Sequence, residues 1–350
     1  MGMGRLSETT GLCAGQGACM MYDRLVTVFG GSGFLGRYIV KRLAEDGWLV
    51  RVAVRRPHEA LFLKPLGIVG QIQLVAANLR VRESVEAAVR DADAVVNAVG
   101  ILSPRGRQRF ETVHVTGARH VAESAAHAGV AALVHISALG ADPASPSAYA
   151  RSKAEGEAAV RAAFPEAVIL RPSVIFGAED DFFNRFAALA HRLPFMPVIA
   201  GDTRFQPVFV GDVADAVGEI FRRRFGHLAD PAPLYELGGP HVESFRTILH
   251  KVLNFTGLAR PLVTVPMPVA RILAVVAQFL PGKPFTPDQL TLLARDNVPS
   301  GDHPGLPELG IMPTPEEAVM PAYLMHFRPE GQFSQGVGGW VSGAVRRAQA

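Results

Sequence analysis

Residues 26–40, VTVFGGSGFLGRYIV, constrain the fold more than any other part of the sequence. An apolar, β-branched run leads into glycines at Gly30, Gly33 and Gly36, and residues with helical spacing follow. Glycine at these positions permits a sharp turn, close approach of the backbone to a pyrophosphate, and packing of helix on strand. The stretch therefore predicts a strand, a dinucleotide-binding turn and a helix; a plain tight turn is the alternative.

The helix after this turn would aim its free backbone N–H groups and the positive end of its dipole at the phosphates. A glycine triplet alone is common, so its place between an apolar strand and an amphipathic helix is what supports the assignment. The residues expected to contact the cofactor here are Gly30, Gly33, Phe34, Leu35, Gly36 and Arg37.

Strand and helix patterns alternate beyond the turn. We expect strands at residues 49–54, 73–76, 94–99, 132–136 and 167–170, and helices at 83–89, 110–128 and 150–163. This alternation is the βαβ rhythm of a parallel sheet covered on both faces. The predicted fold class is α/β: a Rossmann-like, doubly wound parallel sheet with a smaller, mostly helical C-terminal lobe.

The same patterns suggest how the chain is divided. Residues 23–240 form the predicted Rossmann domain, with part of the small lobe inserted after residue 176, and residues 241–330 form the rest of that lobe. Residues 1–22 are expected to be a disordered lead and residues 331–350 a flexible tail. The only cysteines, Cys13 and Cys19, cannot support a disulfide framework or a zinc site, which fits a reducing compartment.

Composition excludes several classes of partner. The net charge is only +3 and basic residues are spread along the chain, so we expect no nucleic-acid partner. The 11 histidines show no metal-ligand spacing, so we predict no metal. The most apolar run, within residues 266–279, is interrupted by Arg271 and is too short to span a bilayer, which requires about 20 residues.

The end of the second predicted strand indicates the cofactor. In NAD-preferring sites a carboxylate about 20 residues beyond the glycines binds the ribose, whereas this chain has Arg55 and Arg56 there. A guanidinium pair suits a 2′-phosphate, and Arg37 could join it, so we predict NADP(H) with NAD(H) as the second choice. Alternatively, these arginines are solvated loop charges. Position along the strands suggests further contacts: Asn78 at the adenine, and Ala98 and Gly100 at the ribose.

Tyr149 and Lys153 are the candidates for chemistry. Four residues apart on a helix, they share one face, so the ammonium can lower the pKa of the phenol and orient a nicotinamide ribose. The strand before them ends at Ser137. Because a tyrosine and a lysine at this spacing are common, a surface pair is the alternative.

With these motifs the chain resembles the extended and atypical short-chain dehydrogenase/reductase superfamily. Within it, the chain resembles the family of complex I (NADH:ubiquinone oxidoreductase) alpha-subcomplex subunit nine. The resemblance runs from about residue 25 to about residue 328. It rests on VTVFGGSGFLGRYIV, SAYARSKAEGE, AFPEAVILRPSVIFGAEDDFFNRF, FQPVFVGDVADAV and HPGLPELGIMPTPEE, of which the third and fifth are the more specific.

The resemblance implies roles for particular residues. The three glycines would hold the pyrophosphate, Arg37 and Arg55 would lie near the adenosine 2′ position, and Lys153 would contact the nicotinamide ribose. Asp212 would tie the small lobe to the sheet, whereas the local pattern favours Asp212 as the N-cap of a helix at residues 213–224, as at least part of its role. Three residues after the sixth strand would border the nicotinamide ring: Arg171, Pro172 and Ser173.

Two departures from the superfamily pattern matter for catalysis. Active members usually end the fifth strand with two serines, the second polarising the substrate carbonyl; here Ser137 is followed by Ala138. Loss of such a donor removes a stabilisation on the order of 3 kcal/mol. His114 stands where many members carry asparagine. These departures fit a cofactor site retained without turnover.

The resemblance therefore implies an NADP(H)-binding accessory subunit of respiratory complex I, structural or regulatory rather than catalytic. Its partners would be complex I core subunits, at the cytoplasmic side of a bacterial inner membrane or the matrix side in a mitochondrion. The alternative is an NAD(P)-dependent epimerase, dehydratase or reductase acting on a small carbonyl or sugar-nucleotide substrate, which the intact Tyr149 and Lys153 favour.

Two C-terminal segments could attach the protein to a partner or to a membrane surface. Residues 266–279 are apolar on most faces, which suggests a hydrophobic partner or a membrane surface; packing against the lobe itself is the alternative. Residues 297–315 are rich in proline and glycine and have too few periodic apolar positions for a core of their own. We expect their order to depend on what they lie against.

Overall fold

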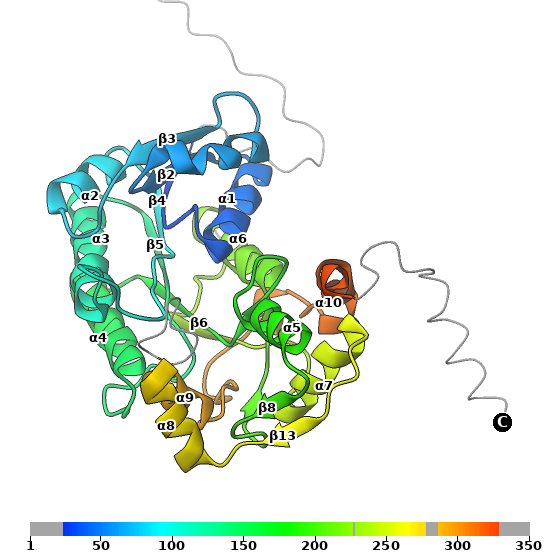
Figure 1. Cartoon of the computed structure of the whole chain (residues 1–350). Helices are drawn as coiled ribbons and strands as arrows, with labels where there is room; N and C mark the ends of the chain where they lie inside the picture. Colours follow the sequence, from blue (N-terminus) through cyan, green and yellow to red (C-terminus); the bar gives the residue numbers. More distant parts are fainter. Residues whose placement is uncertain (1–23, 227, 278–285, 329–350) are drawn as a thin grey trace, which may run out of the picture.

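A seven-stranded parallel sheet lies at the centre of the computed structural model, which describes residues 24–226, 228–277 and 286–328 (Figure 1). The expected lead and tail, residues 1–22 and 331–350, lie outside the described residues. The strand order is β11-β6-β5-β4-β1-β2-β3. The strands are β1 (Leu25–Phe29), β2 (Leu49–Val54), β3 (Ile72–Ala76), β4 (Ala94–Asn97), β5 (Ala132–Ile136), β6 (Val168–Pro172) and β11 (Leu234–Leu237).

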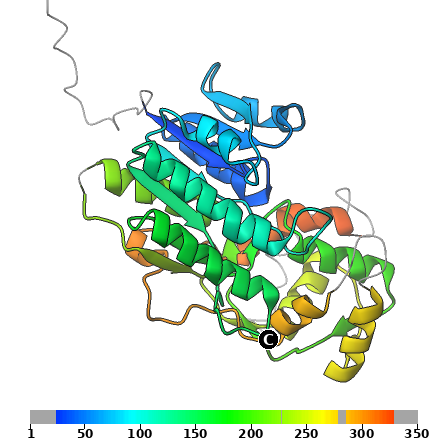
Figure 2. The same cartoon turned by 90° about the vertical axis from the view of Figure 1, so that its left-hand side faces the viewer.

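The sheet is covered on both faces, as the continuous apolar strands predict. Every residue of β4, β5 and β11 is buried. Helices α1 (Phe34–Glu45) and α6 (Val210–Phe225) pack on one face. The other face carries α2 (Arg82–Val89), α3 (Thr116–His127) and α4 (Ala148–Ala163), the last two at the front of Figure 2. The predicted doubly wound α/β fold is therefore confirmed.

The strand order reverses at β1, which lies between β4 and β2. From β1 the chain adds β2 and β3 on one side and then returns to add β4 on the other, so the carboxyl ends of β1 and β4 form the crevice where such sheets bind ligands. Several element boundaries differ from expectation by one or two residues, among them the end of β6 at Pro172 and the start of α4 at Ala148, and two differences have a structural cause. Strand β4 ends at Asn97 because its side chain accepts a hydrogen bond from the Val99 N–H and turns the chain. The expected helix 110–128 begins with a π-helical turn, η2 (Glu111–Val115).

The smaller lobe packs helices and short strand pairs around a cluster of phenylalanines. Phe182, Phe186, Phe205 and Phe245 contact one another edge to face or tilted. The helices are α5 (Phe182–Arg192), α7 (Phe245–Thr256), α8 (Met267–Ala277), α9 (Pro287–Leu293) and α10 (Glu316–Leu324). The strand pairs are β8 (Met196–Val198) with β13 (Leu262–Thr264), β9 (Arg204–Phe205) with β12 (Glu243–Ser244), and β7 (Ile175–Phe176) with β10 (Val208–Phe209). Short helical turns are η1 (Pro57–Leu66), η3 (Pro307–Leu309) and η4 (Met325–Phe327).

Helix α8 is buried on one side only. Ala270 and Ala274 pack against Leu290 of α9, whereas Ile272 and Leu273 are 68% and 56% exposed. Packing against the lobe thus accounts for one face of the apolar run, and its residues 278 and 279 lie outside the described residues. Among the residues that the structure describes, no helix has the length and apolar character needed to cross a membrane.

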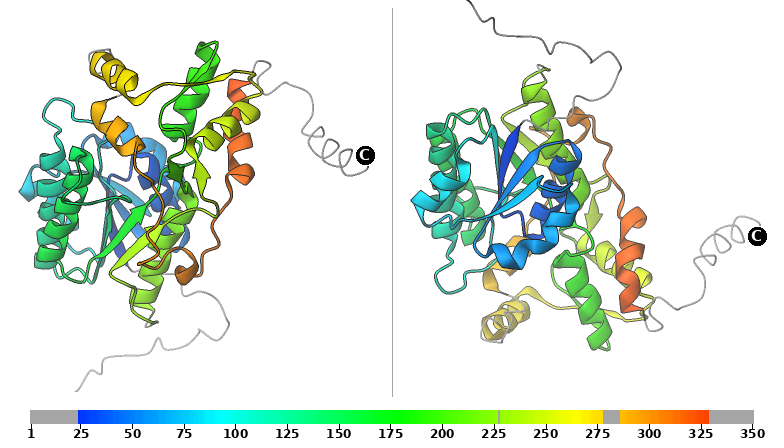
Figure 3. Two further views of the ribbon diagram at one scale, coloured as in Figure 1. Left: turned by 90° about the horizontal axis from the view of Figure 1, so that it is seen from below. Right: turned by 90° about the horizontal axis from the view of Figure 1, so that it is seen from above.

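Residues 295–315, here called the strap, cross from α9 past β11 to α10 along the sheet domain (Figure 3). Leu306 and Leu309 join the core beneath α6, so the segment is ordered by its own domain. The Asp212 carboxylate accepts hydrogen bonds of 2.7 Å from both the N–H and the hydroxyl of Thr314. The N-cap prediction for Asp212 was wrong, because α6 begins at Val210 and Asp212 lies inside it.

Candidate dinucleotide-binding site

The turn after β1 leaves no space for side chains at two of its glycines. Gly30 has φ +80°, and a Cβ there would lie 3.0 Å from the carbonyl of Ala98. A Cβ on Gly36 would collide with the carbonyl oxygen of Gly30 and lie 2.7 Å from the Cα of Gly31. Helix α1 therefore packs directly on the turn, and backbone atoms line the path that a pyrophosphate would take.

The N-terminus of α1 suits an anion. Its N-cap is Gly33, which has no side chain to cap the first N–H groups, and the first turn carries no acidic residue. Phe34 and Leu35 open the helix, and Leu35 is buried against the core. The uncapped N–H groups and the positive dipole end remain available for phosphate oxygens, so the residues present fit a dinucleotide.

The three arginines predicted at the adenosine end have different surroundings. Arg37 forms an ion pair of 3.0 Å with Glu179 and lies over the Phe62 ring, 5.1 Å from its centroid. Arg56 pairs with Glu59. Arg55 is exposed and has no ion-pair or hydrogen-bond partner within the part of the chain that the structure describes. Arg55 is thus the guanidinium most available to a 2′-phosphate.

Three residues with predicted cofactor contacts follow the neighbouring strands. Asn78 comes after β3, is half-buried, and accepts hydrogen bonds from the backbone and side chain of Arg80. Ala98 and Gly100 come after β4, and a Cβ on Gly100 would lie 3.5 Å from the Lys153 Nζ. The carboxyl end of β4 therefore meets the helix that carries Lys153.

Lys153 and Tyr149 lie in the first two turns of α4. The buried Lys153 ammonium donates to the carbonyl of Ile136 at 3.1 Å, and burial lowers its pKa to about 8, against the opposing effect of Glu157. The Tyr149 ring packs edge to face against Phe110 and His114. Burial raises the pKa of Tyr149 to about 12. The expected lowering of this pKa by Lys153 does not occur in this arrangement.

His114 is held in one neutral form. Its Nε2 accepts from the Ile101 N–H at 3.0 Å, so Nδ1 carries the proton and donates to the Ser152 hydroxyl at 2.8 Å. Burial, with the nearby Lys153 ammonium, lowers the pKa of His114 to about 3. A Cβ on Gly156 would collide with the His114 carbonyl oxygen, so α4 packs closely on the π-helical turn.

Two buried polar atoms at the end of β5 lack hydrogen-bond partners among the described residues. They are the Ser137 Oγ and the Nε2 of His135, whose Nδ1 contacts the Asn97 amide at 3.2 Å. Burial, with Lys153 and His114 contributing, lowers the pKa of His135 to about 3. Ser137 directly follows Ile136, whose carbonyl accepts from Lys153, and its hydroxyl is unused; Ala138 follows it without a hydroxyl.

The RPS sequence, which was expected after the sixth strand, lies at the end of β6, and its side chains contact other parts of the protein. Arg171 makes two hydrogen bonds of 2.8 and 2.7 Å to Glu157 of α4 and lies 3.6 Å from Glu236 of β11. The Ser173 hydroxyl donates to the Asn297 side chain of the strap at 2.7 Å. Pro172 ends β6, where its carbonyl accepts from the Leu139 N–H. A contact of these residues with a nicotinamide ring stays a prediction.

Sequence reasoning missed several residues that organise this site: Glu157, Glu179, Asp288 and Asn297. Glu157 follows Lys153 by four residues, a helical spacing that could have indicated it. Asp288 of α9 accepts from the Ala148 N–H at 2.8 Å and from the Ser147 hydroxyl at 3.0 Å, so it caps α4 from 140 residues away. No local pattern predicts such a contact.

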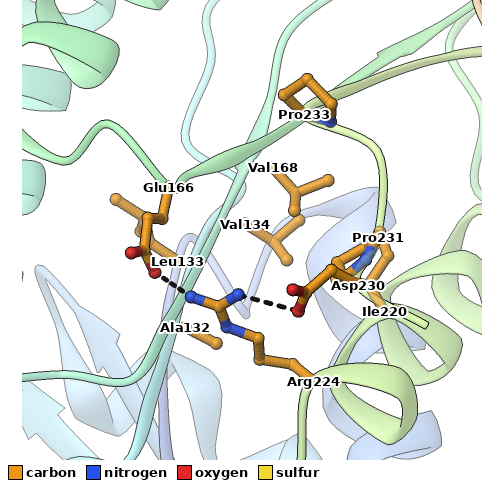
Figure 4. A pocket seen from close by; sticks show the side chains of 10 residues that line it. All are labelled: Ala132, Leu133, Val134, Glu166, Val168, Ile220, Arg224, Asp230, Pro231 and Pro233. Atoms are coloured by element: carbon orange, nitrogen blue, oxygen red, sulfur yellow. Dashed lines mark hydrogen bonds and ion pairs between the residues drawn. The ribbon is translucent and has the colours of Figure 1, made fainter. Parts of the chain in front are cut away.

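Two other features lie away from this edge. A surface cavity of about 280 Å³ lies at the amino ends of β5 and β6, where Arg224 bridges Glu166 and Asp230 (Figure 4). In the lobe, the carboxylates of residues 243, 316 and 317 come close enough together to hold a metal ion, but the Lys251 ammonium contacts all three. An ammonium in this position already supplies the positive charge that a cation would bring.

The fold and the glycine turn define a dinucleotide-binding protein of the Rossmann type. The chain belongs to the NAD dependent epimerase/dehydratase family, whose model matches residues 26–227. The family assignment and the glycine turn together support binding of a nicotinamide dinucleotide. They confirm the resemblance to the short-chain dehydrogenase/reductase superfamily.

Relatives that match most of the chain are mitochondrial NADH dehydrogenase (ubiquinone) 1 alpha subcomplex subunits 9. The subunit from Mus musculus is 34% identical over 311 residues, 84% of this chain and 78% of the relative. That from Arabidopsis thaliana is 31% identical over 323 residues, 88% and 79% respectively. A ceramide reductase of Caulobacter vibrioides is 37% identical over 190 residues, 54% of this chain and 58% of the relative. Among solved structures, the UDP-glucose 4-epimerase of Thermus thermophilus shares the fold, with a TM-score of 0.63 and 21% identity over 87% of this chain and 99% of that chain.

Proposed function

We propose that the protein is an accessory subunit of respiratory complex I that holds NADP(H) as a bound cofactor. The observation that carries this proposal is the similarity to subunit 9, which covers 78–79% of those relatives. The family model ends at residue 227, whereas this similarity takes in 84–88% of the chain. The shared part therefore includes more than a cofactor-binding sheet.

Arg55 supports the choice of NADP(H). Arg55 directly follows β2, the strand that pairs with β1, in the position where NAD-preferring sites carry a carboxylate. Because Arg37 and Arg56 already have carboxylate partners, Arg55 supplies most of the charge for a 2′-phosphate. NADPH should bind at least about tenfold more tightly than NADH, and Arg55→Ala should abolish that difference. Titration calorimetry with both nucleotides measures it, with Arg119→Ala, an exposed arginine on α3, as the control.

Two observations support a cofactor that is not consumed. Ala138 lacks the hydroxyl that would polarise a carbonyl, and a Tyr149 pKa of about 12 makes the phenol a weak acid at neutral pH. The second candidate function is a reductase or epimerase, which the intact Tyr149 and Lys153 and the similarity to a ceramide reductase favour. Incubation of the pure protein with NADPH and a panel of aldehydes, ketones, ceramide precursors and sugar nucleotides separates the two. Cofactor oxidation that Tyr149→Phe abolishes would establish the enzyme.

The exposed face of α8 suits attachment at a membrane. Val269, Ile272 and Leu273 are each more than two-fifths exposed, and residues 245–287 contain no aspartate or glutamate, while Arg260 and Arg271 are basic. An apolar helix face in a segment of the sequence with basic and no acidic residues fits an anionic lipid surface beside the complex. The protein would then lie peripherally at the cytoplasmic side of a bacterial inner membrane, or at the matrix side in a mitochondrion, against core subunits.

Native electrophoresis of detergent-solubilised membranes tests the assembly. The protein should migrate with complex I. The double variant Ile272→Asp/Leu273→Asp should detach, because it would place two charges in the apolar contact that attachment buries. Val69→Asp is the matched control, since Val69 is fully exposed on the sheet domain. NADPH affinity should be unchanged in all three proteins. A wild-type protein that never migrates with complex I would contradict the proposal.

A further inference from the structure

Glu179 is a carboxylate at the edge of the dinucleotide site to which the sequence analysis assigned no role. It lies between β7 and α5, where the small lobe begins, and both its oxygens contact α1. Oε1 pairs with Arg37 Nη1 at 3.0 Å, and Oε2 accepts from the Tyr38 hydroxyl at 2.9 Å. We propose that Glu179 is a specificity-determining residue that lowers the preference for NADPH over NADH by competing with the 2′-phosphate for Arg37. This proposal rests on the proposed cofactor site.

Arg37 is placed where a 2′-phosphate would come. It directly follows the third glycine in the first turn of α1. Its guanidinium lies over the ring of Phe62, which belongs to η1, the segment after Arg55 and Arg56. The side chain therefore reaches the segment that follows β2, the strand at whose carboxyl end such folds bind the adenosine ribose.

The Glu179 carboxylate should weaken the binding of NADPH but not that of NADH. A phosphate on Arg37 would lie close to the Glu179 carboxylate, so the two anions would repel and share one guanidinium. A ribose 2′-hydroxyl carries no charge and can donate a hydrogen bond to a carboxylate. The pair is partly exposed, with side chains 30% and 42% accessible, which limits the effect to a moderate change in affinity.

The small lobe prevents Glu179 from simply moving away. The neighbouring Asp180 is buried and accepts from the Phe183 N–H at 2.6 Å and from the Tyr323 hydroxyl of α10 at 2.8 Å. A Cβ on Gly177 would lie 3.2 Å from the Phe34 ring, so the loop is seated on the start of α1. The competition is therefore fixed by the packing of the lobe.

Titration calorimetry with NADPH and NADH on the full-length protein tests the inference. Glu179→Gln should tighten NADPH binding three- to tenfold and leave NADH binding unchanged or up to threefold weaker. In an Arg37→Ala background the same change should alter NADPH affinity less than twofold. Glu45→Gln is the matched control, because it removes one exposed carboxylate from α1, the helix that carries Arg37, eight residues beyond Arg37 and about 12 Å away along the axis.

The outcomes separate this inference from the function on which it rests. If neither nucleotide binds the wild-type protein, the proposed cofactor site is wrong. If NADPH binds and depends on Arg55, but Glu179→Gln changes both affinities equally or neither, Glu179 does not set specificity. An effect that persists without Arg37, or that Glu45→Gln reproduces, would overturn competition for Arg37. Thermal unfolding of each variant within about 2 °C of wild type shows that the fold is retained.

Discussion

Replacing Arg171 with leucine should reveal whether this guanidinium holds the fold or the cofactor. It joins α4, β6 and β11 through Glu157 and Glu236, whose side chains are only 6% and 7% exposed. Breaking a buried ion pair by removing one partner costs about 3–5 kcal/mol, because a buried charge is left uncompensated. Arg171 is itself 20% exposed and Glu236 keeps hydrogen bonds from Ser300, so we expect the lower end, about 3 kcal/mol. At roughly 2 °C per kcal/mol, Tm should fall by about 6 °C.

Urea and thermal unfolding followed by circular dichroism measure this loss. The double variant Arg171→Leu/Glu157→Leu should recover at least half of it, because the uncompensated carboxylate is gone. Arg161→Leu, at an exposed position in the last turn of α4, should change stability by less than about 0.5 kcal/mol. If Arg171→Leu costs under about 1 kcal/mol while NADPH affinity falls more than tenfold, the structural role argued for Arg171 is refuted and it is a cofactor ligand.

Three further outcomes follow from the geometry. Gly36→Ala should weaken NADPH binding at least tenfold by calorimetry, because a Cβ collides with the Gly30 carbonyl; unchanged affinity would contradict the backbone cradle. Asp212→Ala should cost about 2 kcal/mol by removing both hydrogen bonds to Thr314, and proteolysis should become faster in the strap but not in α3. The third concerns His114, whose pKa of about 3 lies below its unfolded value of 6.5, so its contribution is present above pH 6.5 and is lost as pH falls toward 3. Between pH 7 and pH 5, His114→Asn should therefore lose about 2 kcal/mol less stability than wild type in urea titrations; equal losses would contradict a buried neutral imidazole.

The regular part of the fold could be predicted because its patterns are local. The apolar strands 49–54 and 132–136 were predicted at their observed bounds, since a buried parallel strand reads as a short apolar run between turn residues. The glycine spacing predicted the turn after β1 because steric limits on glycine act within a few residues. The π-helical turn at the start of α3 was missed, since it depends on how closely α4 packs against it.

In the candidate site, too, only the features that depend on local sequence could be predicted. Residue type and spacing indicated the glycines, the arginines after β2 and the Tyr149–Lys153 pair. Which arginine is unpaired, and that the pKa of Tyr149 is raised rather than lowered, depend on groups from distant segments. Glu179 is 142 residues from Arg37.

The sequence by itself thus determined the parallel sheet, the dinucleotide turn and the absence of a hydroxyl at position 138. Those features follow from backbone sterics, from the period of apolar residues and from residue identity. Only the tertiary structure decided that Arg171 serves an ion-pair network, that Asp212 binds the strap and that α8 leaves an apolar face exposed. Ion pairs, hydrogen bonds and burial depend on distances between segments far apart in the chain, and those distances are fixed only when the whole molecule packs.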